Sequence, residues 1–270
     1  QLDAMTRRMR LINEGGETLT LTHMQSASVP MYGRAYDLVH LKGAWARERA
    51  VVRTPLGQAS VRVESQRGAS GHEENPFIAL CEKSATEHSG SVWSMNLVYS
   101  GSFLNEVEGD QTGKTRVQMG LGDENFNYRL KDGETVFAPE AVMTYSPKGL
   151  GVMSRNFHHF ANDHIVPAKA KERRPVVLNS WEAFFFNINE DVMVDFAAAA
   201  ADCGMDMVIM DDGWFGARVN DKAGLGDWYV NKNRFKEGLK PYVDRVKKTG
   251  VKFGIWVEPE MVNPDSDRFR

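Results

Sequence analysis

Residues 207–214 read Met-Val-Ile-Met-Asp-Asp-Gly-Trp, a short apolar run that ends in two adjacent carboxylates, a glycine and a tryptophan. The apolar part is typical of a buried parallel strand that is hydrophobic on both faces. Asp211 and Asp212 would then lie at the C-terminal end of the strand, where ligands bind in α/β sheets and barrels. Carboxylates beside an indole suit a polyhydroxylated ligand, because they accept hydrogen bonds from hydroxyls and the ring covers an apolar C–H face.

The flanking sequence repeats a pattern of strand, helix, strand, helix and strand. Apolar runs at 175–178, 205–210 and 251–257 predict the strands, and residues 189–203 and 235–248 have helical spacing. This order predicts parallel β/α units. Periodicity alone does not separate a doubly wound sheet from a barrel.

Each predicted strand ends in polar and aromatic residues, and these ends would share one face. They are Asn179 and Trp181, then Asp211, Asp212 and Trp214, then Trp256, Glu258 and Glu260. An aspartate after a strand often caps the next element, but two of them before Gly-Trp favour a binding role. Trp181 and Trp256 suit either the core or a sugar platform, and their place at strand ends favours the platform. By spacing alone, Asp212 and Glu258 are either an acid and nucleophile for glycoside cleavage or part of a structural ion pair.

Residues 1 to about 170 have a different pattern, in which short alternating segments are separated by turn residues. The clearest segments are 18–22, 58–63, 91–99, 115–119 and 141–146. This spacing predicts an antiparallel β-sandwich. The adjacent His158 and His159 lack further metal ligands in the sequence, which favours a structural or surface role.

Composition excludes several classes of protein. The 270 residues are 42% hydrophobic and 26% charged with a net charge of -3, as in a globular protein without a nucleic-acid footprint. No stretch reaches the roughly 18–20 apolar residues of a membrane span. Cys81 and Cys203 form no metal or disulfide motif, so two thiols in a chain of this length favour a reducing compartment and a cytoplasmic location.

Four motifs in order resemble the bacterial α-galactosidases of glycoside hydrolase family 36. They are Leu-Asn-Ser-Trp-Glu-Ala at 178–183, Met-Asp-Asp-Gly-Trp-Phe at 210–215, Gly-Leu-Gly-Asp-Trp-Tyr at 224–229, and Gly-Ile-Trp-Val-Glu-Pro-Glu-Met-Val at 254–262. Two weaker matches lie in the β-rich part, at 41–49 and 66–70. The resemblance therefore covers most of the chain.

The resemblance implies a multidomain β plus α/β fold. Residues 1–170 would be the later part of an N-terminal β-sandwich, or supersandwich, domain. Residues 171–270 would be the first three β/α units of a (β/α)8 TIM barrel, truncated after its third strand.

The resemblance also implies a retaining α-galactosidase with two catalytic aspartates, neither of which is expected within this chain. The nucleophile belongs to a Lys-Trp-Asp-type motif on the fourth strand, and the acid/base lies further along. Asp212 and Glu258 are thereby removed from the catalytic pair. Asp211 and Asp212 would bind galactose hydroxyls, with O4 and O6 as the expected partners, while Trp256 and Trp181 would line the same subsite. Trp45 would reach toward the pocket from the sandwich domain.

The expected ligands are α-galactoside oligosaccharides of the melibiose and raffinose type, with no metal or organic cofactor, no nucleic acid and no membrane. A homotetramer is implied by the resemblance. Three alternatives stay open: a catalytically incomplete sugar-binding fragment, a related α-N-acetylgalactosaminidase, and a galactosyl-transferring enzyme.

Overall fold

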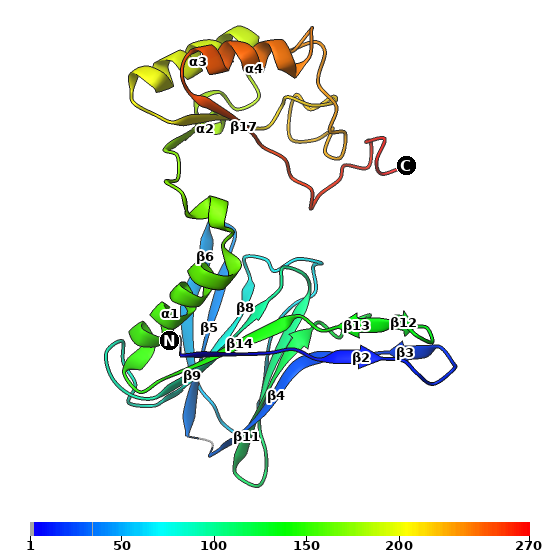
Figure 1. Cartoon of the computed structure of the whole chain (residues 1–270), viewed down its shortest axis with the longest axis vertical. Coiled ribbons are helices and arrows are strands. Elements are labelled where there is room, and N and C mark those ends of the chain that lie inside the picture. The colour runs from blue at the N-terminus through cyan, green and yellow to red at the C-terminus, as the bar shows by residue number, and fades with distance from the viewer. Residues whose placement is uncertain (1–2, 34) are drawn as a thin grey trace. The chain divides into compact units, whose positions relative to one another are not determined.

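The computed structural model describes residues 3–33 and 35–270. The chain divides into two compact units, Gln1–Pro167 (unit 1) and Ala168–Arg270 (unit 2), each with its own core (Figure 1). Among the described residues, no helix has the length and apolar character needed to cross a membrane.

Unit 1 is built on two antiparallel sheets. The six-stranded sheet has the order β1 (Ala4–Arg7), β14 (Glu140–Ser146), β9 (Val92–Val98), β8 (Glu74–Glu82), β5 (Tyr36–Ala44), β6 (Arg47–Pro55). The four-stranded sheet has the order β4 (Gln25–Tyr32), β11 (Lys114–Leu121), β10 (Phe103–Gly109), β7 (Ser60–Ser65). Two short pairs, β2 (Arg10–Ile12) with β13 (Thr135–Phe137) and β3 (Leu19–Leu21) with β12 (Tyr128–Leu130), project as a ribbon (Figure 1).

The core of unit 1 lies between the two larger sheets. Leu38 and Ile78 from the six-stranded sheet and Val107 and Val117 from the four-stranded sheet are buried in one apolar cluster. Alternate residues of each strand point to one face, so the period-two pattern of the sequence produces this layer. The predicted antiparallel sandwich is confirmed.

A helix within unit 1, α1 (Gly149–Phe160), was not predicted from the sequence. It lies across the outer face of the six-stranded sheet, where Met153 packs with Val39 (Figure 1). Its first residues include two glycines, which disfavour a helix, so tertiary packing of its apolar stripe stabilises it instead. His158 and His159 are exposed on this helix.

Unit 2 contains three parallel strands in the order β15 (Val177–Asn179), β16 (Met207–Met210), β17 (Lys252–Ile255). The short α2 (Trp181–Phe184) and α3 (Glu190–Asp202) connect the first two strands, and α4 (Leu239–Lys248) precedes the third. The predicted β/α units are confirmed, and the strands form an open sheet rather than a closed barrel.

Two details of unit 2 differ from the expectation. Helix α4 begins at Leu239 rather than at residue 235, because Gly238 has a φ of +86° and so cannot belong to the helix. Strand β16 is buried on one face only: Val208 and Met210 pack under α3 and α4, whereas Ile209 on the other face is half-buried.

Candidate functional site

The chain bends directly after β16, and this bend, called the turn below, presents Asp211 and Asp212. Gly213 has a φ of +100°, and a Cβ atom there would lie 2.7 Å from Nη1 of Arg234. The same Nη1 donates a hydrogen bond of 2.8 Å to the Gly213 carbonyl oxygen. Only glycine combines this backbone conformation with so close an approach, which explains its place after the two aspartates.

Asp211 joins the ends of two strands. Its Oδ2 accepts a 2.7 Å hydrogen bond from Nδ2 of Asn179, which ends β15, and its Oδ1 accepts one of 2.7 Å from the Asp212 amide. The Asp211 amide donates to Oγ of Ser180 at 3.0 Å. Asp211 is therefore held in one orientation although it follows a strand end.

Asp212 forms a buried ion pair with Arg218. Nε of Arg218 lies 3.0 Å from both carboxylate oxygens, and Nη2 lies 2.7 Å from Oδ2. Both side chains are only 6% exposed. A bidentate pair of this kind is strong and directional, so it sets the plane of the carboxylate.

Both aspartates keep the capacity to accept further hydrogen bonds. An ionised carboxylate offers about four acceptor sites. Within the described residues, Asp211 receives one side-chain and one backbone hydrogen bond, and Oδ1 of Asp212 receives only the shared Nε–H of Arg218. The protein thus orients two carboxylates side by side without saturating them, as a site for hydroxyl groups requires.

Aromatic rings surround this turn. Nε1 of Trp214 donates to the Trp256 carbonyl oxygen at 2.9 Å, which links the ends of β16 and β17. Phe215 lies 4.4 Å from Trp228 and 6.4 Å from Trp256, measured between ring centroids. Trp256 is half-buried, so part of its ring stays accessible.

Trp181 is the first residue of α2 and follows the last residue of β15, Asn179, by two positions. Its ring meets that of Phe186 edge-on at 5.1 Å, and the guanidinium of Arg218 lies 5.6 Å from the Phe186 ring centroid. Trp181 is half-buried, and its amide donates to Oδ1 of Asn179 at 2.7 Å. Trp181 is thereby connected to both aspartates through Asn179, Phe186 and Arg218.

Glu258, after β17, is the third carboxylate near the turn. Burial raises its pKa, the neighbouring Glu260 adds to the rise, and Arg218 opposes it. Glu258 is half-buried, whereas Glu260 is exposed. Of the alternatives that the sequence left open for Asp212, the structure shows the ion pair, and Arg218 is its cationic partner.

The glycine-rich loop at 224–229 packs against the last residues of the chain. Leu225 and Asn263 exchange two hydrogen bonds, of 2.8 Å from the Leu225 amide to the Asn263 side chain and of 2.9 Å between backbone atoms. Oδ1 of Asp227 accepts from the Asp267 amide at 3.0 Å. The loop is also tied to the turn, because Nη1 of Arg218 donates to the Ala223 carbonyl oxygen at 3.1 Å.

Four of the five residues predicted for the site lie around this turn in unit 2, namely Asp211, Asp212, Trp181 and Trp256. Trp45 lies in unit 1, in the turn between β5 and β6, and is 83% exposed. Sequence reasoning missed Arg218 and Arg234. The only signal for them was indirect, since a buried aspartate needs a cationic partner.

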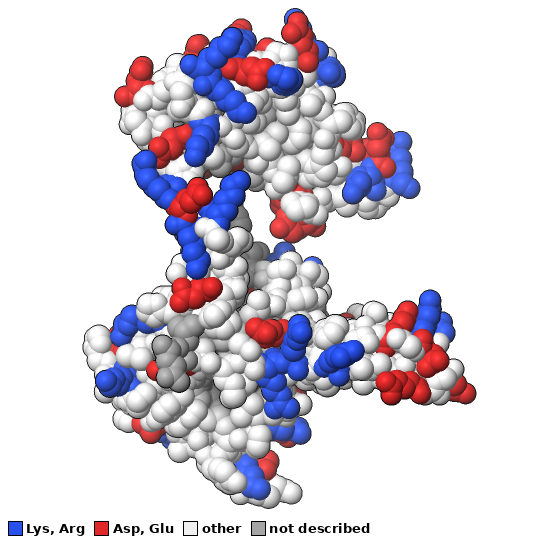
Figure 2. Space-filling view, in the orientation of Figure 1, with Lys and Arg blue, Asp and Glu red and all other residues white. Residues whose placement is uncertain are grey.

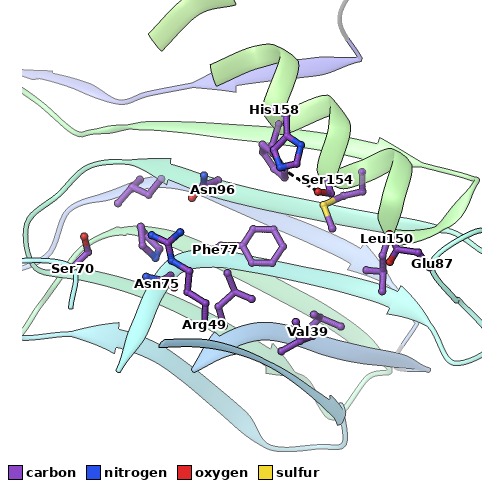
Figure 3. A pocket seen from close by; sticks show the side chains of 16 residues that line it. Val39, Arg49, Ser70, Asn75, Phe77, Glu87, Asn96, Leu150, Ser154 and His158 are labelled. Carbon is purple, nitrogen blue, oxygen red and sulfur yellow. Dashed lines mark hydrogen bonds between the residues drawn. The ribbon is translucent and has the colours of Figure 1, made fainter. Parts of the chain in front are cut away.

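Unit 1 has a groove of about 650 Å³ between α1 and the six-stranded sheet (Figure 3). Phe77 lies at its centre and Arg49, Asn75 and His158 lie around it (Figure 3). None of the five predicted site residues lines this groove.

Acidic and basic side chains are interspersed on the face shown in Figure 2. Across residues 3–33 and 35–270, no group of three or more His, Cys, Asp or Glu residues is arranged to hold a metal ion.

Comparison with known proteins assigns both parts of the chain. Residues 135–270 match the Melibiase family model, and residues 1–131 match the model of the glycosyl hydrolase family 36 N-terminal domain. The chain is 44% identical over 269 residues to alpha-galactosidase AgaA of Geobacillus stearothermophilus, covering 99% of this chain and 37% of that protein. It is 43% identical over 269 residues to the bifunctional alpha-galactosidase/sucrose kinase AgaSK of Mediterraneibacter gnavus, covering 99% of this chain and 29% of that protein.

The crystal structure of AgaA superposes with a TM-score of 0.94 and covers 100% of this chain and 38% of its own. A variant of AgaA has been solved in complex with raffinose and another with stachyose. The chain thus spans less than two-fifths of the length of these relatives. With one family model matching half of the chain and the second matching most of the remainder, the chain belongs to the Melibiase family of glycosyl hydrolases and carries the family 36 type of N-terminal domain.

Proposed function

We propose that the polypeptide containing this chain is an α-galactosidase that hydrolyses terminal, non-reducing α-D-galactosyl residues of melibiose- and raffinose-type sugars. The observation that carries the proposal is the turn after β16, where two oriented carboxylates are linked by contacts to half-buried tryptophans in a chain of this family. The raffinose and stachyose complexes of a relative 44% identical to this chain support the substrate class.

In this proposal the 270 residues bind the sugar, and the reacting carboxylates belong to other parts of the polypeptide. Asp211 and Asp212 accept hydrogen bonds from galactose hydroxyls, and the exposed parts of Trp256 and Trp181 cover its C–H faces. The reaction retains the anomeric configuration: one carboxylate attacks the anomeric carbon, and the other protonates the leaving oxygen and then activates water.

Hydrolysis by the full-length polypeptide tests the substrate class. The p-nitrophenyl α-galactoside should be cleaved far faster than the corresponding α-N-acetylgalactosaminide, and proton NMR should show α-galactose as the first product. Preference for the N-acetylated sugar would favour the α-N-acetylgalactosaminidase alternative. A product that is mainly oligosaccharide at moderate substrate concentration would favour the galactosyl-transferring alternative.

Residues 1–270 alone provide a second test. We expect no turnover from this segment, because the proposal places both reacting carboxylates outside it. Measurable cleavage by the segment would show that at least one reacting carboxylate lies within residues 1–270. Assembly as a tetramer and a cytoplasmic location complete the proposal, and analytical ultracentrifugation and cell fractionation of the full-length protein test them.

A further inference from the structure

Arg218 makes more directed contacts than charge neutralisation requires. Its guanidinium contacts both oxygens of Asp212, the Ala223 carbonyl oxygen and the face of Phe186. The side chain is 6% exposed. A guanidinium held on an anion, a carbonyl and a ring has little freedom to rotate, so it holds whatever carboxylate is paired with it.

The surrounding backbone is shaped around this side chain. Gly224 has a φ of +86°, and a Cβ atom there would lie 2.8 Å from the Arg218 amide nitrogen and 3.0 Å from its Cβ. The start of the glycine-rich loop therefore packs directly on Arg218. This packing and the Ala223 hydrogen bond hold the arginine by contacts that do not involve Asp212.

The hydrogen bonds to Asp212 are distributed unequally between its two oxygens. Oδ2 receives the Nη2–H at 2.7 Å and a share of the Nε–H at 3.0 Å, whereas Oδ1 receives, from the part of the chain that the structure describes, only a share of the Nε–H at 3.0 Å. Oδ1 therefore keeps more accepting capacity than Oδ2. The pairing leaves one oxygen of the carboxylate for a ligand and fixes the plane in which that oxygen lies.

We propose that Arg218 is a positioning residue for galactoside recognition: it turns the Asp212 carboxylate so that Oδ1 meets a hydroxyl of the galactosyl group. This inference rests on the proposed function. Arg218 does not touch the sugar in this arrangement and acts through Asp212. A lysine at this position keeps the charge but cannot hold both oxygens in a plane.

A double-mutant cycle in the full-length enzyme tests this role. R218K should lower kcat/KM for p-nitrophenyl α-galactoside by about 10²-fold, the loss expected when a binding group is misplaced by about 1 Å. In a D212N background, R218K should change kcat/KM by less than about threefold, because the carboxylate that it positions is already absent. R245K is the matched control: Arg245 pairs with Asp191 at the surface of α3 and α4, so its kcat/KM should stay at the wild-type value.

Deoxy substrates distinguish positioning from a purely structural role, because a structural defect would lower kcat/KM equally whichever hydroxyl the substrate lacks. The wild type and D212N are compared on 4-deoxy and 6-deoxy α-galactosides. If D212N no longer lowers kcat/KM for one of these analogues, the hydroxyl that the analogue lacks is the one that Asp212 contacts. The effect of R218K should disappear with the same analogue. If R218K does not fold, R218Q takes its place in both experiments, since its amide retains a donor without the charge.

Additive losses for R218K and D212N, or an R218K loss that is equal for all three substrates, would overturn the positioning role while leaving the proposed function intact. A wild-type enzyme without turnover of any α-galactoside would overturn the proposed function and this inference together.

Discussion

Replacing Asp212 by asparagine should destabilise the protein as well as impair sugar binding. The substitution keeps the size of the side chain but leaves Arg218, 6% exposed, without its counter-charge. Removing one partner of a buried pair costs about 3–5 kcal/mol, and we expect the lower end, about 3 kcal/mol, because the asparagine oxygen can still accept one hydrogen bond. For a domain with about 5–15 kcal/mol of stability this is a large fraction.

Urea unfolding of the full-length protein, followed by tryptophan fluorescence, measures this cost. Trp214, Trp228 and Trp256 lie close together beside the turn and report on its environment. D227N is the matched control, because Asp227 is also buried but accepts a backbone hydrogen bond and has no ion pair in the described part of the chain. Its cost should stay below about 1 kcal/mol, since the asparagine oxygen can keep that bond.

The double variant D212N/R218M gives the decisive comparison. It removes both charges and leaves an apolar side chain of similar length, which is often neutral when a buried ion pair is replaced. We expect the double variant to recover most of the stability lost in D212N and to keep the lowered kcat/KM of D212N. The reasoning fails if D212N unfolds at the same urea concentration as the wild type, or if the double variant is less stable than D212N.

Three further predictions concern other parts of unit 2. Y242F should raise the free energy of unfolding by about 1 kcal/mol, because the Tyr242 hydroxyl is fully buried and has no hydrogen-bond partner in the described part of the chain; a loss of stability in urea unfolding would show that the hydroxyl is satisfied. N189A should lower the free energy of unfolding by about 1 kcal/mol, because the Asn189 side chain caps α3 by accepting from the Val192 amide; N189D should behave like the wild type, and an unchanged N189A would contradict the capping role. Glu258 has a pKa raised above its ordinary value of 4.5, so its contribution to stability is full below that value and is lost as the pH rises through the folded-state pKa. E258Q should therefore remove part of the decline in stability that begins as the pH rises above 4.5, and parallel pH profiles for the variant and the wild type would contradict the shift.

Local sequence signals were sufficient for much of unit 2. Asn189 at the start of α3, Gly204 after its end and the apolar run of β16 each act within a few residues, so the three strands, the two longer helices and their order were predicted correctly, whereas the short α2 was not predicted. The start of α4 was predicted four residues too early, and the reason is again a local one. The apolar spacing extends back to Phe235, but the positive φ of Gly238 places that residue in the preceding turn.

Unit 1 marks the limit of such signals. Its alternating segments predicted a sandwich, which is confirmed, but neither the pairing order of the strands nor α1 followed from them. Strand order depends on contacts between residues far apart in the chain. Helix α1 has weak intrinsic propensity and is stabilised by the sheet that it covers.

The sequence by itself determined that two aspartates follow a parallel strand, and its motifs indicated the family and the sugar class. Only the tertiary structure decided what holds each carboxylate: Asn179 from the neighbouring strand for Asp211, and Arg218 from the following loop for Asp212. The physical reason is that burial makes an unpaired carboxylate costly, so the carboxylate pairs with whichever donor the fold brings close to it. Sequence periodicity predicts helices and strands but does not predict which residues from different elements come close together.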